Sequence, residues 1–277
     1  MKAFMFPGQG SQKKGMGAEY FDTFAALVAE ADDILGYSLK ALCLEDANEQ
    51  LNNTAFTQPA LFCINHFHFL AKGETADYYL GHSLGEYNAL LAAGIISFTD
   101  GLKLVQERGR LMSEVKNGGM SAIIGLAQNQ LEDLLQDYAS IDLANINAPN
   151  QIVVSGPAED LGPLEEACKA AGASMAIRLN VSGAFHSRYL KTVADQFHNS
   201  LQTAKFSIAT VPVISNVSAD IYPNENQAQL LEQQIYSSVQ WVKSIHKLKD
   251  LGVSEFTEVG PGRVLGGLLR HIERALK

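Results

Sequence analysis

The stretch Leu80-Gly81-His82-Ser83-Leu84-Gly85-Glu86 (LGHSLGE) decides the fold that we predict for this chain. Residues 77–81 favour a short buried strand, and residues 86–93 favour a helix that ends at Gly94. The glycines two positions before and two positions after Ser83 are typical of a turn so tight that larger side chains do not fit. A strand that passes directly into a helix through such a turn indicates an α/β protein.

Ser83 at this turn has two interpretations. In the first it is a nucleophile, because the turn exposes its hydroxyl and the N-terminus of the next helix points toward the developing oxyanion. In the second it is a polar residue that caps the helix in a glycine-rich turn. The strand before Ser83 and the helix after it favour the nucleophile.

A serine nucleophile needs a base, and the chain contains seven histidines. His82 adjoins Ser83, where direct proton abstraction is geometrically awkward. His186 lies in the loop of residues 181–187, which joins two parts of the predicted fold, and such loops commonly form the walls of clefts. His186 is therefore the candidate base, and its spacing in the sequence leaves that role open.

Arg108 lies on the apolar side of a predicted helix. Its neighbours at positions 104, 105, 111 and 112 are Leu, Val, Leu and Met, so none of them can neutralise a guanidinium. Arg110 lies off this side and can pair with Glu107 or Glu114. The anion that Arg108 needs is a carboxylate of the fold in one interpretation and a substrate carboxylate in another. In a third interpretation the side chain extends to water.

Composition narrows the functional class. The chain has 277 residues, of which 47% are hydrophobic and 18% are charged, as is ordinary for a globular enzyme. Its net charge of −9 argues against nucleic-acid binding over the whole surface. The sequence shows no run as apolar as a membrane helix and no signal peptide, so we expect a cytoplasmic enzyme without membrane contact. The cysteines at 43, 63 and 168 lack the spacing of a zinc site, so we expect no metal.

The chain on either side of the quoted stretch alternates strands and helices. Before it we expect a strand at 2–6, a helix at 18–35, and a helix that Thr57 or Gln58 caps, with Pro59 in its first turn, running to about Lys72. After it we expect a helix that Thr99 or Asp100 caps, running to about Val115. Farther along we expect a helix at 187–201, a strand at 211–215, helices at 227–236 and 242–251, a strand at 253–259 and a helix from Arg263 to Leu276.

Between these segments the order of elements changes. We expect strands at 120–126, 140–146, 151–155 and 174–179 and helices at 128–138 and 159–171. The order βαββαβ within about sixty residues is typical of a ferredoxin-like unit. We therefore predict a small ferredoxin-like subdomain at 118–184, inserted into a large α/β subdomain made of residues 1–117 and 185–277.

Motifs along nearly the whole chain resemble those of one family. They are FPGQGSQ (6–12), TQPAL (57–61), GHSLGEY (81–87), ERGRLM (107–112), NAPNQIVVSG (147–156), AFH (184–186), VQW (239–241) and EVGPGRVL (258–265). On these motifs the chain resembles the malonyl-CoA:acyl carrier protein transacylases, the acyltransferases of fatty-acid and polyketide synthesis. The resemblance implies that the large subdomain is α/β-hydrolase-like, with a parallel sheet.

The resemblance also implies a mechanism. Ser83 would carry the acyl group, and His186 would be its base, oriented by the main-chain carbonyl of Gln240 instead of by an aspartate. Arg108 would bind the free carboxylate of the malonyl group. Malonyl-CoA would acylate the serine, and the phosphopantetheine thiol of an acyl carrier protein would then take the malonyl group, with no permanently bound cofactor.

Further residues would contact the substrate. The backbone N–H groups of Gln9 and Leu84 would form the oxyanion hole, and Met112 and Phe185 would line the substrate site. Phe185 belongs to an Ala-Phe-His ending, typical of malonyl-selective polyketide acyltransferases, although Gly183 stands where those enzymes usually have a histidine. The ending favours a discrete, trans-acting polyketide enzyme over a housekeeping fatty-acid enzyme, and we expect a monomer.

Two other functions compete with this one. A hydrolase on the same scaffold would remove stalled acyl groups from carrier proteins, but it would not need Arg108 to bind a carboxylate. A non-catalytic docking module would need neither Ser83 nor His186. The basic residues next to the motifs are either candidates for binding an acidic carrier protein or ordinary solvated side chains; they are Lys13, Lys14, Arg188 and Lys191.

Overall fold

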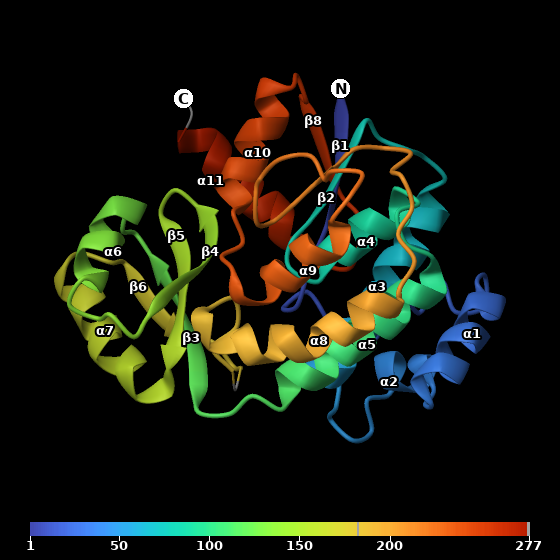
Figure 1. The fold of residues 1–277 in the computed structure, drawn as a ribbon, viewed down its shortest axis with the longest axis horizontal. Helices are drawn as coiled ribbons and strands as arrows, with labels where there is room; N and C mark the ends of the chain where they lie inside the picture. Colours follow the sequence, from blue (N-terminus) through green and yellow to red (C-terminus); the bar gives the residue numbers. More distant parts are fainter. Residues whose placement is uncertain (182, 276–277) are drawn as a thin grey trace.

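The structure, a computed structural model, describes residues 1–181 and 183–275, which form two β-sheets with helices packed on them (Figure 1). The strands are β1 (Lys2–Phe6), β2 (Tyr78–Gly81), β3 (Gly118–Ile124), β4 (Asp142–Ala148), β5 (Gln151–Pro157), β6 (Met175–Arg178), β7 (Val213–Ile214) and β8 (Glu255–Glu258). The helices are α1 (Ala25–Leu35), α2 (Leu39–Leu44), α3 (Thr54–Lys72), α4 (Gly85–Ala92), α5 (Phe98–Ser113), α6 (Gln128–Leu135), α7 (Ala158–Ala170), the short 3₁₀ turn η1 (Arg188–Leu190), α8 (Lys191–Thr203), α9 (Gln227–Tyr236), α10 (Trp241–Asp250) and α11 (Val264–Ala275). This is the predicted α/β fold, and the predicted last helical residue, Leu276, lies outside the described residues.

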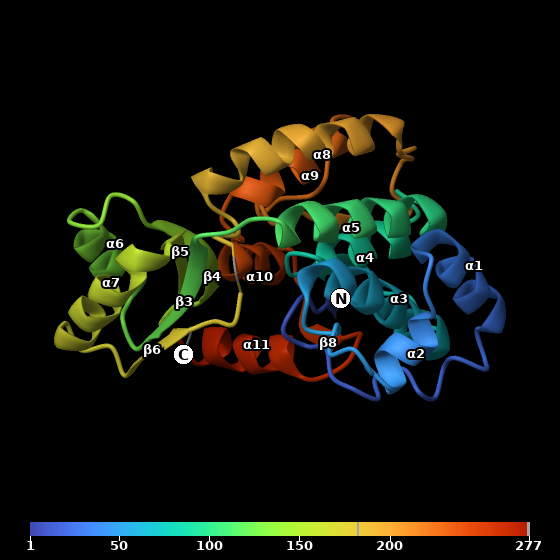
Figure 2. The same cartoon turned by 90° about the horizontal axis from the view of Figure 1, so that it is seen from below.

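The larger unit is built on a sheet of four parallel strands in the order β7-β2-β1-β8. The side chains of β1 alternate between two cores. Phe4 and Phe6 belong to the core that α3, α4 and α5 share, whereas Ala3 and Met5 belong to the core that α10 and α11 share. Figure 2 shows these helices as a blue-to-green group and a red group. Because helices cover both faces, this strand is a continuous apolar run in the sequence.

Candidate functional residues follow the carboxyl ends of these parallel strands. The loop after β1 carries Gln9, the turn after β2 carries Ser83, and the segment after β7 carries Asn216. Parallel strands present their carboxyl ends at one edge of the sheet, where ligands commonly bind in open α/β folds. Three segments that are distant in the sequence therefore meet at this edge.

The second sheet is antiparallel, with the strand order β4-β5-β3-β6. Its strands are thus arranged as second, third, first and fourth, and α6 and α7 pack on it (Figure 1). This is the ferredoxin-like arrangement that the βαββαβ order indicates. All four strands lie within residues 118–184, and the division of the chain into subdomains at those residues stays a prediction.

The chain enters and leaves the antiparallel unit at neighbouring points. A Cβ atom on Gly118, the first residue of β3, would lie 2.4 Å from the backbone nitrogen of Ala184, so only glycine allows this approach. His186 follows Ala184 by two residues. The closure of the unit therefore also fixes where that histidine meets the parallel sheet.

The first helix is shorter than its apolar pattern predicts. α1 begins at Ala25, not at residue 18, because residues 14–24 form successive turns. Gly15 and Gly17 in this segment have φ angles of 88° and 77°, which are in the left-handed region. The short helix α2 was not among the predicted elements.

The start of α3 also differs from the prediction. The helix begins at Thr54, and the Asn53 side chain caps it by accepting a hydrogen bond from the Ala55 N–H at 3.1 Å. Pro59 therefore lies in the second turn, and neither Thr57 nor Gln58 is the cap. The Thr57 hydroxyl instead donates to the carbonyl oxygen of residue 51 at 2.6 Å.

Candidate active site

Ser83 lies on the predicted strand-to-helix turn, between β2 and α4. Its φ of 52° is in the left-handed region, which non-glycine residues rarely adopt. Close backbone packing requires both glycines: a Cβ on Gly81 would lie 1.9 Å from the carbonyl oxygen of Gly85, and a Cβ on Gly85 would lie 2.0 Å from that of Phe6. Asn216 Oδ1 accepts a hydrogen bond from the Ser83 backbone N–H at 2.7 Å. The geometry is that of a nucleophile elbow.

The Ser83 hydroxyl is hydrogen bonded to His186. The serine Oγ and the histidine Nε2 are 2.7 Å apart. The Nδ1 atom lies 2.8 Å from the main-chain carbonyl oxygen of Gln234, which can only accept, so Nδ1 carries the proton and Nε2 accepts from the serine. Burial, together with the charge of Arg108, lowers the pKa of His186 to about 3. The imidazole is therefore neutral at pH 7 and can accept a proton.

The carbonyl that orients His186 belongs to Gln234, and the prediction of Gln240 is wrong. Gln240 is the N-cap residue of α10, and its carbonyl oxygen accepts from the backbone N–H and from the hydroxyl of Ser244, both at 2.9 Å. Gln234 lies in the last turn of α9. Carbonyl groups in a last turn have no partner within their own helix, so this one is available to the imidazole.

Arg108 of α5 faces the same hydroxyl. Its Nη2 donates to Ser83 Oγ at 3.2 Å and to Gln234 Oε1 at 3.0 Å, and its Nη1 donates to Gln58 Oε1 at 2.7 Å. Arg108 is 1% exposed, so it does not extend to water. Within the described part of the chain it forms no ion pair with a carboxylate. No described carboxylate contacts it directly, and its role in binding a substrate carboxylate stays a prediction.

Arg110, two positions farther along α5, behaves as predicted. Its guanidinium pairs with Glu107 and with Glu114, each at 2.7 Å. This helix therefore has one arginine that its own neighbours neutralise and one that they do not.

Ser83, His186 and Arg108 line a cavity of about 110 Å³. Its wall also includes the predicted substrate-binding residues Gln9, Leu84, Met112 and Phe185, and residues of the antiparallel unit and the segment that follows it, namely Met120, Asn145, Leu179 and Val181. The cavity thus lies between the two sheets, with the chemically reactive groups on one side of it.

Two backbone N–H groups beside this cavity have no acceptor among the described residues; they belong to Gln9 and Leu84. Gly8 brings their two segments together, since a Cβ at that position would lie 2.4 Å from the carbonyl oxygen of His82. Unpaired N–H donors next to a nucleophile are suited to bind an oxyanion.

Sequence reasoning misses four polar residues of the site. Gln58 and Gln234 hold Arg108, as described above, and Glu86 accepts hydrogen bonds from Gln234 and from the backbone of Asn216. Gln58 and Glu86 lie inside quoted motifs, and Asn216 directly follows a predicted strand, so each had a local signal. Gln234 lies within a predicted helix, and no local pattern distinguishes it.

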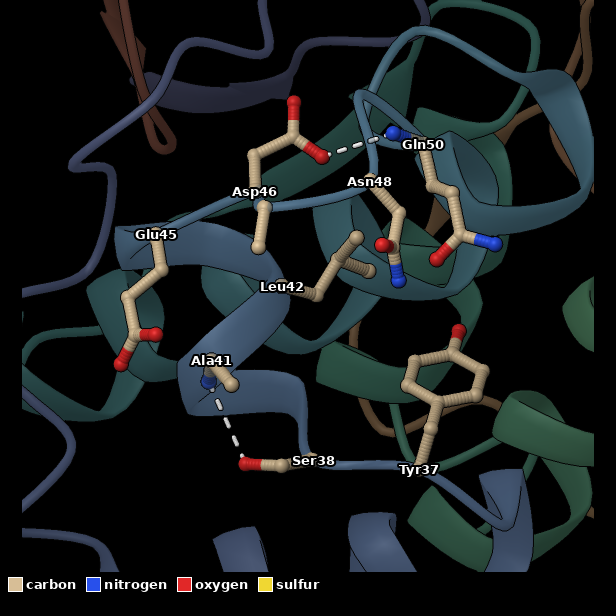
Figure 3. Close-up of a pocket in the computed structure, with 9 residues that line it drawn as sticks. Tyr37, Ser38, Ala41, Leu42, Glu45, Asp46, Asn48 and Gln50 are labelled. Atoms are coloured by element: carbon tan, nitrogen blue, oxygen red, sulfur yellow. Dashed lines mark hydrogen bonds between the residues drawn. The ribbon is translucent and has the colours of Figure 1, made fainter.

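A second cavity, of about 170 Å³, lies at α2 and the loop that follows it (Figure 3). Its polar groups bind the nearby backbone: Ser38 Oγ accepts from the Ala41 N–H at 3.2 Å, and Asp46 Oδ1 accepts from the Gln50 N–H at 2.7 Å. None of the described residues that line it is histidine, lysine or arginine. We therefore assign the chemistry to the cavity at Ser83.

Other classes of site have no support within residues 1–181 and 183–275. No group of three or more His, Cys, Asp or Glu side chains there is placed to hold a metal ion. In the same residues, no helix is both long enough and apolar enough to cross a membrane. The three cysteines are buried and unpaired.

Comparison with known proteins gives a consistent result. The acyl transferase domain model matches residues 3–275. A polyketide biosynthesis malonyl CoA-acyl carrier protein transacylase of Bacillus subtilis is 47% identical over 99% of this chain and 98% of that protein. A crystal structure of malonyl CoA-acyl carrier protein transacylase from Burkholderia pseudomallei has a TM-score of 0.96 and 46% identity, covering 99% of this chain and 98% of that one. Another solved structure is a complex of a type II polyketide synthase acyl-carrier protein with its malonyl-transacylase. The matched chain has a TM-score of 0.92 and 37% identity, covering 99% of this chain and 93% of that one.

The elbow and the serine–histidine pair define a class of enzymes that transfer acyl groups through an acyl-serine. Within that class, the chain belongs to the acyl transferase family, among the malonyl-CoA:acyl carrier protein transacylases.

Proposed function

We propose that this chain is a malonyl-CoA:acyl carrier protein S-malonyltransferase, which moves the malonyl group through an ester on Ser83. The observation that carries this proposal is the position of Arg108, a buried guanidinium with no ion-pair partner in the described residues and 3.2 Å from Ser83 Oγ. An acyl group on the serine lies within reach of this cation, which favours a chain that ends in a carboxylate. The names of the relatives support the same substrate and carrier.

In the first half-reaction, Ser83 Oγ attacks the thioester carbonyl carbon of malonyl-CoA while His186 Nε2 accepts the hydroxyl proton. The carbonyl oxygen becomes an oxyanion, which the N–H groups of Gln9 and Leu84 stabilise. The carbon–sulfur bond then breaks, and the coenzyme A sulfur leaves with the proton that the histidine returns. A malonyl ester remains on the serine, with its carboxylate on Arg108.

The second half-reaction runs in the opposite direction with a different thiol. The phosphopantetheine thiol of the carrier protein gives its proton to His186 and attacks the ester carbon. The bond to Ser83 Oγ breaks, and the proton returns to the serine. Because one thioester is exchanged for another, the leaving group is good, and the histidine needs only a carbonyl to orient it.

The rival functions fit the site less well. A hydrolase that removes stalled acyl groups has no use for a buried guanidinium beside the serine, and the relatives compared above are named transacylases. A non-catalytic docking module does not explain the 2.7 Å hydrogen bond between Ser83 and His186.

We also propose that the enzyme is a cytoplasmic monomer that serves polyketide carrier proteins in trans. The Bacillus subtilis relative, named for polyketide biosynthesis, and the position of Phe185 in the cavity wall support this pathway. Of the four basic residues considered for docking, Arg188 and Lys191 pair with carboxylates of the chain. Lys13 and Lys14 form no ion pair among the described residues, so they remain the docking candidates.

The test weighs the intact protein after it is mixed with malonyl-CoA. The wild type should gain one malonyl group and lose it when an acyl carrier protein bearing phosphopantetheine is added. Ser83→Ala should gain none, because it lacks the hydroxyl that is hydrogen bonded to His186. Malonyl-loaded carrier protein should accumulate. Free malonate as the main product would favour the hydrolase, and malonyl transfer by Ser83→Ala would contradict the mechanism.

A further inference from the structure

A buried carboxylate that the proposed mechanism does not use lies one side chain away from Arg108. Glu86, in the first turn of α4, is 0% exposed and forms no ion pair with any described residue. Three donors point at its carboxyl group instead. The Tyr222 hydroxyl donates to Oε1, and Oε2 accepts from Gln234 Nε2 at 2.7 Å and from the Asn216 backbone N–H at 3.2 Å. Three donors suit an ionised carboxylate, which only accepts.

Gln234 connects this carboxylate to every reactive group of the site. Its Nε2 donates to Glu86 and to the main-chain carbonyl oxygen of Ser83, at 2.7 and 2.8 Å. Because both amide hydrogens are used, Oε1 faces Arg108 and accepts from its Nη2 at 3.0 Å. The main-chain carbonyl of the same residue orients His186. If the side-chain amide were reversed, its NH₂ group would meet the guanidinium, and two donors would face each other.

This arrangement reconciles two requirements on Arg108. A buried guanidinium needs a negative charge nearby. A carboxylate in direct contact would occupy the nitrogen atoms that a substrate carboxylate has to reach. With the neutral amide of Gln234 between Arg108 and Glu86, the charge is balanced while Nη2 still faces Ser83 Oγ.

We propose that Glu86 is a positioning residue: acting through the side chain of Gln234, it holds Arg108 in the orientation that receives the substrate carboxylate and supplies the balancing charge. The inference rests on the proposed function, because that function assigns the malonyl carboxylate to Arg108. We expect Glu86 to set the preference for malonyl over uncharged acyl groups, with little effect on the reaction of Ser83 with His186.

The test compares the rates at which malonyl-CoA and acetyl-CoA acylate Ser83 in the full-length chain, followed by intact mass. Glu86→Gln keeps the shape of the side chain and removes its charge. The malonyl rate should fall about 10- to 100-fold, as expected for the loss of a well-oriented charged hydrogen bond. The acetyl rate should change by less than about threefold, because an acetyl group has no carboxylate for Arg108 to bind.

Two further variants show whether Glu86 acts through Gln234. Gln234→Met removes the amide at similar length and should give the same selective loss, and the double variant should be no worse than Gln234→Met alone. Tyr222→Phe is the matched control, since it removes a hydrogen bond to the other carboxyl oxygen. Measured at about pH 9, where Glu86 stays ionised even without the Tyr222 hydrogen bond that lowers its pKa, the malonyl-to-acetyl ratio of this variant should stay within about threefold of the wild type.

The contrary results are distinct. An equal fall with both acyl donors in Glu86→Gln would indicate a merely structural role and would overturn the proposal, as would an unchanged ratio. A ratio that fell as far in Tyr222→Phe would show that the contact with Gln234 is not what matters. A wild type that takes no malonyl group from malonyl-CoA would overturn the proposed function and this inference together. A wild type and a Glu86→Gln variant with the same preference for malonyl would overturn only the inference.

A pH profile of the wild type is a second test, which needs no variant. Burial raises the pKa of Glu86 to about 7 against the opposing effect of its hydrogen bonds. Of the groups around it, Tyr222 and Tyr87 have pKa values raised by burial, Arg108 stays charged, and His186 is neutral. Glu86 is therefore the group among these that titrates near pH 7. Both acyl donors carry the same coenzyme A part, so any titration of that part cancels in the ratio of their rates. The malonyl-to-acetyl ratio should fall as the pH decreases from about 8 to about 6. A ratio that is level over this range would overturn the proposal.

Discussion

At the scale of single residues, neutral amides hold the reactive groups in place. Gln58 and Gln234 bind the guanidinium of Arg108, and Asn216 binds the backbone N–H of Ser83. An amide has fixed donor and acceptor ends, so it can orient a charged group without cancelling its charge. The guanidinium of Arg108 therefore faces the serine without a carboxylate in direct contact, as an acyl group with a carboxylate requires.

The same reasoning predicts the effect of Arg108→Ala. Removal of the guanidinium should lower the rate of malonyl transfer about 10- to 150-fold, the worth of a hydrogen bond between charged groups, and shift the preference toward acetyl. Arg108→Lys should give an intermediate loss, since it keeps the charge without the planar fork. The measurement is the ratio of kcat/KM for malonyl-CoA and acetyl-CoA. A malonyl preference that survived Arg108→Ala would assign the arginine another role.

The reactive residues could be predicted because each is chemically out of place in its sequence pattern. Ser83 stands between two glycines at a strand end, and Arg108 stands on an apolar helix face without a neighbouring anion. The structure brings both to one cavity with His186. The carbonyl that orients the histidine could not be predicted correctly, because it depends on where α9 ends in space. No local sequence pattern distinguishes Gln234 from Gln240 as the residue whose carbonyl binds His186.

At the scale of secondary structure, the elbow depends on backbone contacts between β1, β2 and α4. A Cβ at position 85 would lie 2.0 Å from the carbonyl oxygen of Phe6, and no rotation of a side chain can relieve that contact. Gly85→Ala should therefore lower the free energy of unfolding by about 3 kcal/mol or more, beyond ordinary overpacking.

The matched control for Gly85→Ala is Gly267→Ala in α11, where a Cβ would lie 3.9 Å from its nearest neighbour, an ordinary contact. In a helix interior this change should raise the stability by up to about 1 kcal/mol. Urea denaturation of both variants and the wild type is the measurement. Equal stability of Gly85→Ala and the wild type would mean that the elbow is not tightly packed.

Element types could be predicted better than element boundaries. The order βαββαβ is visible in the sequence, and the antiparallel sheet has the strand order that it indicates. The predicted start of the first helix, residue 18, is seven residues too early. The apolar spacing from 18 to 24 fits turns packed on α3 as well as it fits a helix. Apolar periodicity reports which side chains are buried, and it does not report the backbone φ angles at Gly15 and Gly17.

At the scale of the whole molecule, buried histidines should make stability depend on pH. His186 has a pKa of about 3 in the folded chain against an ordinary value of 6.5. Below pH 6.5 the unfolded chain therefore binds a proton that the folded chain does not, so stability falls as the pH decreases. At pH 5 the buried His186 should lower the free energy of unfolding by about 2 kcal/mol, and well above pH 6.5 it should have no such effect.

A His186→Asn variant isolates this contribution. The difference in unfolding free energy between pH 7.5 and pH 5, measured by urea denaturation, should be about 2 kcal/mol smaller in the variant than in the wild type. The other groups, including Glu86 with its raised pKa, are common to both proteins and largely cancel. Identical pH dependence in the two proteins would show that the folded chain can hold a protonated imidazole at this position.

The close approach of Gly118 and Ala184 has a consequence for how such enzymes diversify. The two ends of the antiparallel unit meet, so a different unit with the same spacing between its ends could be grafted there without displacing Ser83, Arg108 or His186, which all lie outside it. Met120, a residue of this unit that lines the cavity, would be replaced together with the unit. The part of the cavity wall that the unit supplies could therefore differ between such enzymes while Ser83, Arg108 and His186 stay in place.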